Sequence, residues 1–258
     1  MKIIVLMKQV ANKDAVLRIG PDEKWINEAD ISHQTNESDG YALEEALRLK
    51  EAKGEGEVVV CSLGPQSAKA VIKDALARGA DRAIHVVVED SKKLSPFQIA
   101  KAIADAIRDE KADLVLTGLQ SDDASYGQTG VILAELLGIP HATIVIEVDR
   151  GSLGESLRVK RELESGWYQW FTYQLPSLLT IQSGISQIRY ASLKGIMAAK
   201  KKEIRDVAPT VEEFAGAQTI QKVYMPLKTK QTQMLGNGDA KAGAVELVEK
   251  LRTEVRAI

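Results

Sequence analysis

The chain contains a single cysteine, Cys61, and its scarcity excludes two kinds of site. A disulfide framework needs paired cysteines, and a cysteine-based metal centre needs several. Since Cys61 lies in an apolar run at residues 58–61, we expect a buried core thiol. The histidines His33, His85 and His141 are isolated, and no His-x3-His or Glu-x2-His spacing is present. We therefore predict no metal site.

Long hydrophobic runs and an excess of one charge are also missing. No apolar stretch approaches the roughly 18 to 20 residues that span a membrane. The first ten residues, MKIIVLMKQV, turn polar too early for a signal peptide and are typical of a first strand. The formal net charge is −2, so no global field favours nucleic acid or an anionic membrane. We expect a cytoplasmic protein that neither binds nucleic acid nor inserts directly into a membrane.

Motifs of nucleotide-cleaving and nucleophilic enzymes are absent. Neither GxGxxG nor GxxxxGK[ST] occurs, and Lys8-Gln9-Val10 stands where an SGGxDS-like pyrophosphate loop would follow the first strand. No G-x-S-x-G elbow appears. Asp122 and Asp123 are adjacent on a predicted loop, where such pairs more often cap a helix than act as acid and base. These absences favour a protein that binds and presents a ligand over an enzyme, and we predict no catalytic residue.

The first two thirds of the chain alternate between apolar strands and helices. Near-continuously apolar strands separated by helices are typical of a parallel sheet covered on both faces, so we predict a three-layer α/β fold. The predicted strands are residues 2–7, 57–62, 82–88, 113–117 and 142–148. The predicted helices are residues 41–53 capped by Ser38-Asp39, 67–78 closed by Gly79, 95–110 with Pro96 in the first turn, and 128–137 ending at Gly138.

The pattern changes after residue 149. A hairpin is expected at residues 150–182, closing on Leu175-Pro176 with an apolar strand at 177–181. Residues 209–237 show little periodicity, and residues 239–257 return to a helix whose apolar face cannot be buried alone. We therefore divide the chain into an α/β domain at 1–208 and a C-terminal arm at 209–258. The arm either packs on another subunit, which we favour, or docks back on its own domain.

Three loops leave the predicted carboxyl ends of strands, where ligands bind in such sheets: residues 8–9, 62–65 and 118–127. The third is small and polar and leads into a helix, whose free N–H groups attract an anion. Gln128 and Thr129 fall in the first turn of that helix, and Asp123 is placed to bond a ribose or to orient the loop. A purely structural polar loop is the alternative.

These residues together resemble the β subunit of electron transfer flavoprotein over essentially the full chain. The strongest match is VKRELESG at residues 159–166, followed by Gln169, Leu175-Pro176 and the apolar residues 178–180. Residues 5–10, 36–39, 43–46 and 79–82 are similar to further family segments. Ser165 and the aromatic run at 167–171 depart from the usual pattern.

The resemblance implies a nucleotide-binding domain of the adenine nucleotide alpha hydrolase-like kind and a heterodimer with an α subunit, on which the arm would pack. The redox FAD would be held mainly by the α subunit, and this chain would bury a structural AMP. The residues that the resemblance assigns to the AMP are Leu6, Asn36, Asp39, Ser62, Gly64, Asp123, Ser125, Gln128 and Thr129.

One branch of the family bifurcates electrons, oxidises NADH and holds a second FAD in place of AMP. Its loop typically reads D-G-D-x-x-Q-V-G-P, whereas residues 123–131 read DASYGQTGV. The missing proline and the bulky Tyr126 favour the AMP-binding branch, with the bifurcating branch as the alternative. A nucleotide-binding module of the universal stress type, without a redox role, is a third hypothesis, but residues 159–202 have no place in it.

The resemblance also implies a docking loop within residues 184–202. Leu193 corresponds to an anchor leucine that enters an apolar pocket on a flavoprotein dehydrogenase, most commonly an acyl-CoA dehydrogenase of fatty acid β-oxidation. The expected docking residues are Tyr190, Leu193, Ile196 and Lys200. Electrons would pass onward to electron transfer flavoprotein-quinone oxidoreductase. The alternatives are a core-facing role for Leu193 and Ile196 and a solvated helix end for the lysines at 200–202.

Overall fold

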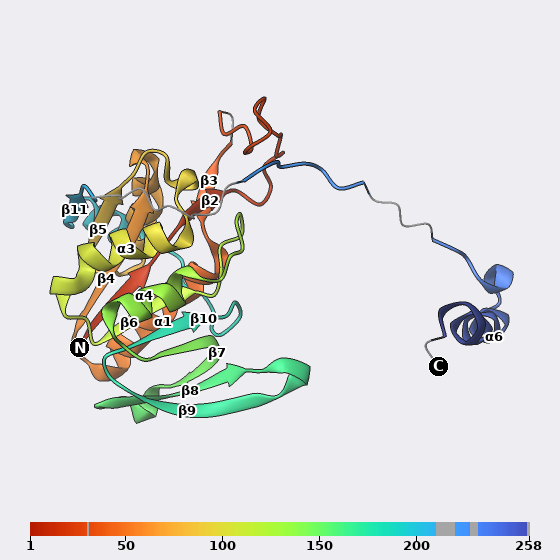
Figure 1. Cartoon of the computed structure of the whole chain (residues 1–258). Coiled ribbons are helices and arrows are strands. Elements are labelled where there is room, and N and C mark those ends of the chain that lie inside the picture. Colours follow the sequence, from red (N-terminus) through yellow and green to blue (C-terminus); the bar gives the residue numbers. More distant parts are fainter. Residues whose placement is uncertain (30, 210–219, 228–231, 257–258) are drawn as a thin grey trace.

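The computed structural model describes residues 1–29, 31–209, 220–227 and 232–256. Within these residues, nine strands form one sheet in the order β11-β5-β4-β1-β6-β10-β7-β8-β9. The strands from β11 to β7 are parallel, and β8 and β9 continue the sheet as antiparallel neighbours. A short antiparallel pair, β2 and β3, follows β1 and stands at one end of the sheet (Figure 1).

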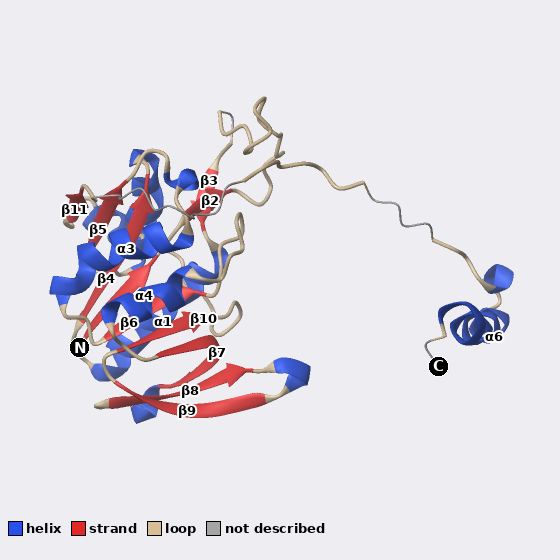
Figure 2. Ribbon diagram, in the orientation of Figure 1, coloured by secondary structure: helices blue, strands red, loops and turns tan. Residues whose placement is uncertain are grey.

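The bounds of the elements are as follows. The strands are β1 Lys2–Leu6, β2 Gln9–Ala11, β3 His33–Thr35, β4 Glu57–Gly64, β5 Arg82–Val87, β6 Leu114–Gly118, β7 His141–Asp149, β8 Ser156–Glu162, β9 Tyr168–Gln174, β10 Ser177–Ile181 and β11 Ile204–Val207. The helices are α1 Glu37–Lys53, α2 Lys69–Arg78, α3 Pro96–Ile107, α4 Thr129–Leu137, α5 Leu193–Ala199 and α6 Ala240–Lys250. Figure 2 shows how the helices surround the sheet.

The core consists of two apolar layers, one on each face of the sheet. Alternate residues of a strand point to opposite faces, so Ile3 and Val5 of β1 pack with α1 and α2, while Ile4 and Leu6 pack with α3 and α4. The central strands β1, β4, β6 and β10 are almost wholly buried because both faces of the sheet are covered there. The three-layer α/β fold predicted from the sequence is confirmed.

Helix α1 begins four residues before the predicted start. Ser38 and Asp39 lie inside its first turn, and the N-cap is Asn36, whose side chain makes no capping bond. The prediction that Ser38-Asp39 caps the helix was therefore wrong: both side chains are buried and contact the loop after β6 instead. Helix α3 has Pro96 in its first turn, as predicted, and its N-cap is Ser95, which forms a capping box with Gln98.

The hairpin is also shorter than predicted. Strands β8 and β9 pair in antiparallel register from Ser156 opposite Gln174 to Glu162 opposite Tyr168, so the hairpin turns at residues 163–167. Leu175-Pro176 instead leads out of the hairpin into β10, which lies in the parallel sheet between β6 and β7. All five residues of β10 are buried, Ser177 and Thr180 included, as expected for a strand inside the sheet with both faces covered.

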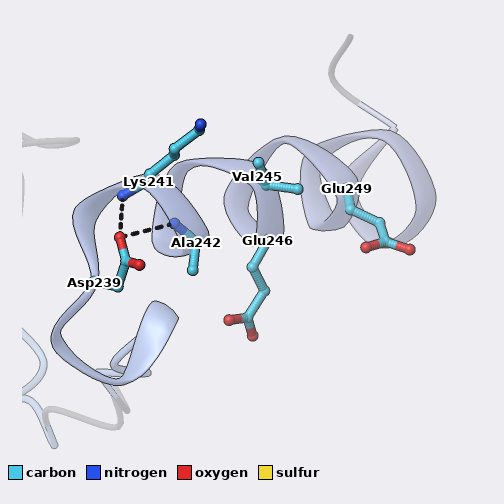
Figure 3. A pocket seen from close by; sticks show the side chains of 6 residues that line it. All are labelled: Asp239, Lys241, Ala242, Val245, Glu246 and Glu249. Atoms are coloured by element: carbon cyan, nitrogen blue, oxygen red, sulfur yellow. Dashed lines mark hydrogen bonds between the residues drawn. The ribbon is translucent and has the colours of Figure 1, made fainter.

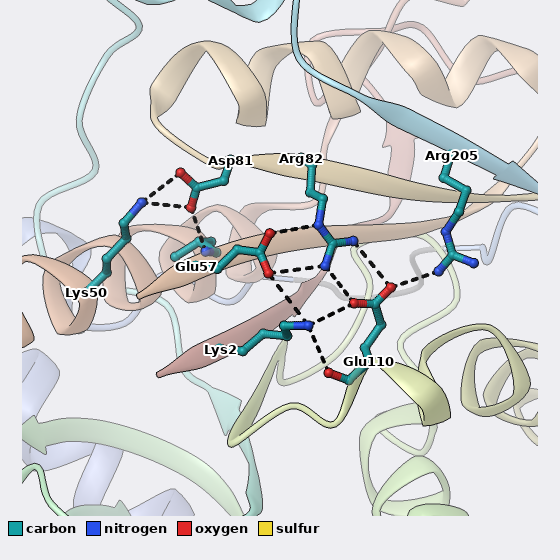
Figure 4. Close-up of polar contacts among 8 residues, drawn as sticks. Lys2, Lys50, Glu57, Asp81, Arg82, Glu110 and Arg205 are labelled. Atoms are coloured by element: carbon teal, nitrogen blue, oxygen red, sulfur yellow. Dashed lines mark hydrogen bonds and ion pairs between the residues drawn. The ribbon is translucent and has the colours of Figure 1, made fainter. Parts of the chain in front are cut away.

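A network of ion pairs lies at the amino ends of the strands (Figure 4). Glu110, just after α3, accepts from Lys2 of β1, Arg82 of β5 and Arg205 of β11, at 3.2, 2.6 and 2.9 Å. Glu57 of β4 is paired with Arg82 at 2.8 Å. The network therefore joins four neighbouring strands at their amino ends.

Candidate functional site

A cavity of about 260 Å³ lies at the carboxyl ends of β1, β4 and β6. The strand order reverses here, because the chain continues from β1 to β4 on one side and returns to β6 on the other. Ligands bind at such switch points in open parallel sheets. The three loops predicted from the sequence all contribute to the lining, through Lys8, Pro65 and Ser121 among others.

Asp39 joins the loops after β1 and β6 at the floor of the cavity. One carboxylate oxygen accepts from the Lys8 backbone N–H at 2.7 Å, and the other accepts from the Gly118 N–H at 2.9 Å. Burial raises the pKa of Asp39 to about 7, and the bonds from Lys8, Asn36 and Gly118 offset only part of that effect. Asp39 therefore fixes the backbone around the cavity, and its two oxygens are already engaged.

Asn36 and Asp122 hold the long loop after β6 against the start of α1. The Asn36 side chain donates to the Gln120 carbonyl at 3.0 Å and accepts from the Asp122 N–H at 2.9 Å. In return, the Asp122 carboxylate accepts from the Glu37 N–H at 3.1 Å. The free N-terminal N–H group of α1 is thus capped by a residue of the distant loop, which explains why Asn36 is free to turn toward that loop.

Lys8 and Asp123 form an ion pair at the cavity. The Lys8 ammonium lies 2.6 Å from the Asp123 carboxylate and 3.3 Å from the Ser121 hydroxyl. Burial by itself would raise the pKa of Asp123, but the charge and hydrogen bonds of Lys8 and the bonds from Ser121 and Ala124 hold it below its ordinary value. Asp123 is therefore ionised at neutral pH and orients the loop, one of the two roles predicted for it.

The N-terminus of α4 supplies the feature suited to an anion. Gln128 is the N-cap without a side-chain capping bond, and Thr129 is the first helical residue. Gly130 lies close to the sheet: a Cβ there would be 2.9 Å from Thr117 Oγ1 and 3.0 Å from the methyl group of Thr180. The helix end therefore directs its free N–H groups toward the cavity from a fixed position.

The structure brings six of the nine predicted AMP residues to the cavity: Leu6, Asn36, Asp39, Asp123, Gln128 and Thr129. Ser62, Gly64 and Ser125 are outside its lining. Ser62 follows Cys61 on β4, and Cys61 faces the cavity, so the Ser62 side chain points to the α1 and α2 side of the sheet. Its buried hydroxyl has no hydrogen-bond partner among the residues that the structure describes. Gly64 accepts from His85 at 3.1 Å, and Ser125 bonds back to Ser121.

The sequence did not reveal the apolar end of the cavity. Trp25 and Ile26 come from the irregular segment between β2 and β3, and Ile99 and Ile103 come from α3. Ile99 and Ile103 are four residues apart and so lie on one face of α3, but no local signal places Trp25 at the site. Cys61 adds to this wall, and burial raises its pKa to about 12, so the thiol stays protonated.

The four predicted docking residues lie on one exposed segment. Tyr190 is 97% exposed and Leu193 84% exposed, and Ile196 and Lys200 are also exposed. The alternative in which Leu193 and Ile196 face the core therefore does not hold. The lysine cluster is split: Lys202 is partly buried and donates to the Leu76 carbonyl at 2.9 Å, so it fastens the end of α2.

Residues 220–227 of the C-terminal arm lie near the segment between β2 and β3, because the Val223 N–H donates to the Glu23 carbonyl at 2.7 Å. Residues 210–219 and 228–231 lie outside the described residues, so the boundary at 208 and 209 remains a prediction. Helix α6 stands away from the sheet (Figure 1). Figure 3 shows its Asp239 cap, which accepts from the Lys241 and Ala242 N–H groups. Val245 and Val255 of this region are 64% and 63% exposed.

No helix among the described residues is long and apolar enough to cross a membrane. No group of three or more His, Cys, Asp or Glu side chains in that part of the chain is arranged to hold a metal ion.

Comparison with known proteins identifies the family. The electron transfer flavoprotein domain family matches residues 24–212. The electron transfer flavoprotein subunit beta of Methylophilus methylotrophus is 33% identical over 254 residues, which cover 95% of this chain and 96% of that protein. The mitochondrial subunit beta of Oryza sativa subsp. indica is 34% identical over 262 residues and 100% of both chains. The human subunit beta is 36% identical over 211 residues, 81% of this chain and 82% of that protein. The chain therefore belongs to the electron transfer flavoprotein family, as a beta subunit.

Proposed function

We propose that this chain forms a non-bifurcating electron transfer flavoprotein with an alpha subunit and holds a structural AMP. In this proposal the complex takes electrons from a flavoprotein dehydrogenase, with acyl-CoA dehydrogenase the first candidate. It then passes them to a membrane quinone oxidoreductase. FAD shared with the alpha subunit supplies the redox chemistry when bound. Cytoplasmic location and a role in fatty acid oxidation belong to the same proposal.

The observation that carries the AMP assignment is the cavity at the carboxyl ends of β1, β4 and β6. Its volume is about 260 Å³, and its lining combines an apolar wall with a few polar groups, as small-molecule sites typically do. The apolar wall at Ile99 and Ile103 fits a base, and the first turn of α4 fits a phosphate.

The residues divide into those that hold the loops and those that face the ligand. The polar atoms of Asn36 and Asp39 bond to the backbone of the loops, so we assign these two residues the role of maintaining the shape of the cavity. Gln128 and Thr129, at the start of α4, are assigned to the phosphate. Lys8 offers a positive charge to an anionic ligand in the cavity, and in the structure this charge is paired with Asp123.

The exposed segment at residues 190–196 supports the assignment of a docking surface. A short segment with a largely exposed leucine such as Leu193 suits a small anchored contact rather than a permanent interface. Such contacts allow fast release, which a carrier between two redox partners needs. Lys200 would favour an acidic partner surface and make the encounter rate sensitive to salt.

The test is the identity of the nucleotides that heat releases from the purified complex of this chain with its co-expressed alpha subunit. We expect one FAD and one AMP per heterodimer. Two FAD and no AMP would assign the complex to the bifurcating branch. A homodimer that binds ATP without an alpha subunit would contradict the electron-carrier function as a whole.

A further inference from the structure

Glu44, on the inner side of α1, is a buried carboxylate with four hydrogen bonds. One oxygen accepts from Arg48 Nε at 2.6 Å and from Arg189 Nη2 at 3.2 Å. The other accepts from Arg189 Nε at 2.9 Å and from the Arg189 backbone N–H at 3.1 Å. Burial alone would raise the pKa of Glu44, but the bonds from Arg189 and Arg48 outweigh it and lower the pKa. The side chain is 3% exposed, so Glu44 is a charged group engaged entirely within the protein.

The partners of Glu44 fasten the chain immediately before the exposed docking residues. Glu44 binds both the backbone and the side chain of Arg189. Arg189 also pairs with Glu51, which lies about two turns after Glu44 on α1. Arg48 donates to the Gln187 carbonyl at 2.8 Å. The next side chain, Tyr190, is 97% exposed. The chain is thus held at Arg189, whereas the side chain of the following residue is almost fully exposed to solvent.

The other end of the exposed segment is fastened as well. The Ser192 hydroxyl accepts from the Gly195 N–H at 3.0 Å and caps α5. Gly195 lies so close to α2 that a Cβ would overlap the Ala77 carbonyl oxygen. Residues 190–193, called here the docking segment, are therefore a short span between two anchored points, with Leu193 at 84% exposure.

We propose that Glu44 is a positioning residue for partner docking, which holds Arg189 to α1 and so fixes the docking segment in the conformation that presents Leu193. The proposal rests on the docking role proposed above for Leu193. A preorganised segment binds more tightly because the cost of ordering it is met during folding. Since Glu44 is buried, it influences the partner only through the residues that it binds, Arg189 and Arg48.

The test compares Glu44→Gln with the wild type in the complex with the alpha subunit. The readouts are KM and kcat for flavin reduction by an acyl-CoA dehydrogenase with its acyl-CoA substrate, and amide hydrogen exchange of residues 187–193. We expect KM for the complex to rise roughly tenfold while kcat and flavin content are unchanged, with faster exchange at the docking segment.

Glu45→Gln is the matched control. Glu45 is adjacent, is 0% exposed, and is paired at 2.7 Å with Arg150 in the turn after β7, on the hairpin side. The substitution removes a buried charge from the same helix without touching Arg189. We expect its KM and its exchange at residues 187–193 to equal those of the wild type. Equal changes in both variants would overturn the proposal, since they would show a general loss of stability.

Unchanged KM and exchange in Glu44→Gln would also overturn it. If that variant does not fold, Arg189→Lys replaces it, because lysine keeps the charge but loses the forked contact with Glu44. Exchange like the wild type in Arg189→Lys would then refute the positioning role. Leu193→Ala separates the two proposals: a wild-type KM in that variant refutes docking through Leu193, whereas the exchange measurement still decides whether Glu44 holds the segment.

Discussion

Replacing Glu110 by glutamine should lower the free energy of unfolding by an amount that depends on pH. Glu110 is 13% exposed and accepts from three cations, Lys2, Arg82 and Arg205. Hydrogen bonds from Arg82 are the largest cause of its low pKa, about 2 against an ordinary 4.5; burial opposes them, and Lys2 adds to them. Glutamine preserves the shape but leaves Lys2 and Arg82 with Glu57 as their remaining carboxylate, and it removes the carboxylate with which Arg205 is paired.

The size of the effect follows from the pKa. One pKa unit corresponds to about 1.4 kcal/mol, so the difference between 4.5 and about 2 corresponds to about 3 kcal/mol. Solvent screens part of this, because the side chains of Lys2, Arg82 and Arg205 are 30, 20 and 45% exposed. We therefore expect a loss of about 1 to 2 kcal/mol at pH 7.

The pH dependence has a definite sign. A carboxyl group whose pKa is lower in the folded state stabilises the protein above its unfolded pKa, and this stabilisation is lost as the pH falls toward the folded pKa. For Glu110 the window runs from about 4.5 down to about 2. Wild type and variant should differ fully at pH 7 and progressively less below pH 4.5.

The assay is denaturant unfolding of the complex at about pH 7, 5, 4 and 3.5, values that cover the upper part of the expected window. Glu164→Gln, which removes an exposed carboxylate at the hairpin turn, is the control and should have little effect. A difference between wild type and Glu110→Gln that stays constant over this range would refute the electrostatic reasoning. The network lies at the amino ends of the strands and the cavity at their carboxyl ends, so nucleotide content should be unchanged.

Three further outcomes are expected. Leu193→Ala should reduce kcat/KM for reduction by the dehydrogenase by roughly tenfold to a hundredfold, since burying a leucine contributes about 1.5 to 3 kcal/mol, while flavin content stays normal. Gly118→Ala should lower AMP content and stability because its Cβ would overlap Ser38 and the Asp39 carboxylate; Gly154→Ala, where a Cβ meets nothing within 4 Å, should do neither. Removing AMP should lower the melting temperature, and adding it back at about 100 times its Kd should restore about 2.7 kcal/mol; no shift on addition would contradict a structural role.

The sequence predicted the parallel core well because its strands are apolar on both faces and its helices end at glycines such as Gly79 and Gly138. It placed β10 wrongly because residues 177–181 follow a hairpin directly, and periodicity within a strand does not show which strands will be its neighbours. Only the folded sheet brings Leu178 and Leu179 between β6 and β7.

The candidate site was predicted as three loops, because the rule for carboxyl ends needs only the order of strands and helices. What sequence could not supply were contacts between distant segments. The bond from Asp39 to Gly118 spans 79 residues, and that from Asn36 to Asp122 spans 86. Trp25 reaches the cavity from a segment without periodicity, so its position depends on the tertiary packing alone.

Helix α1 has 17 residues and is therefore about 25 Å long. Its first turn fixes the loops around the cavity through Asp39, its middle holds Arg189 through Glu44, and its far end is paired with the loop after α2 through Lys50. Under the proposed function, a change in the register or tilt of this helix would alter AMP retention and partner contact together. A lineage that adopts a new dehydrogenase would then vary the exposed side chains, such as Tyr190, while α1 keeps its buried carboxylates.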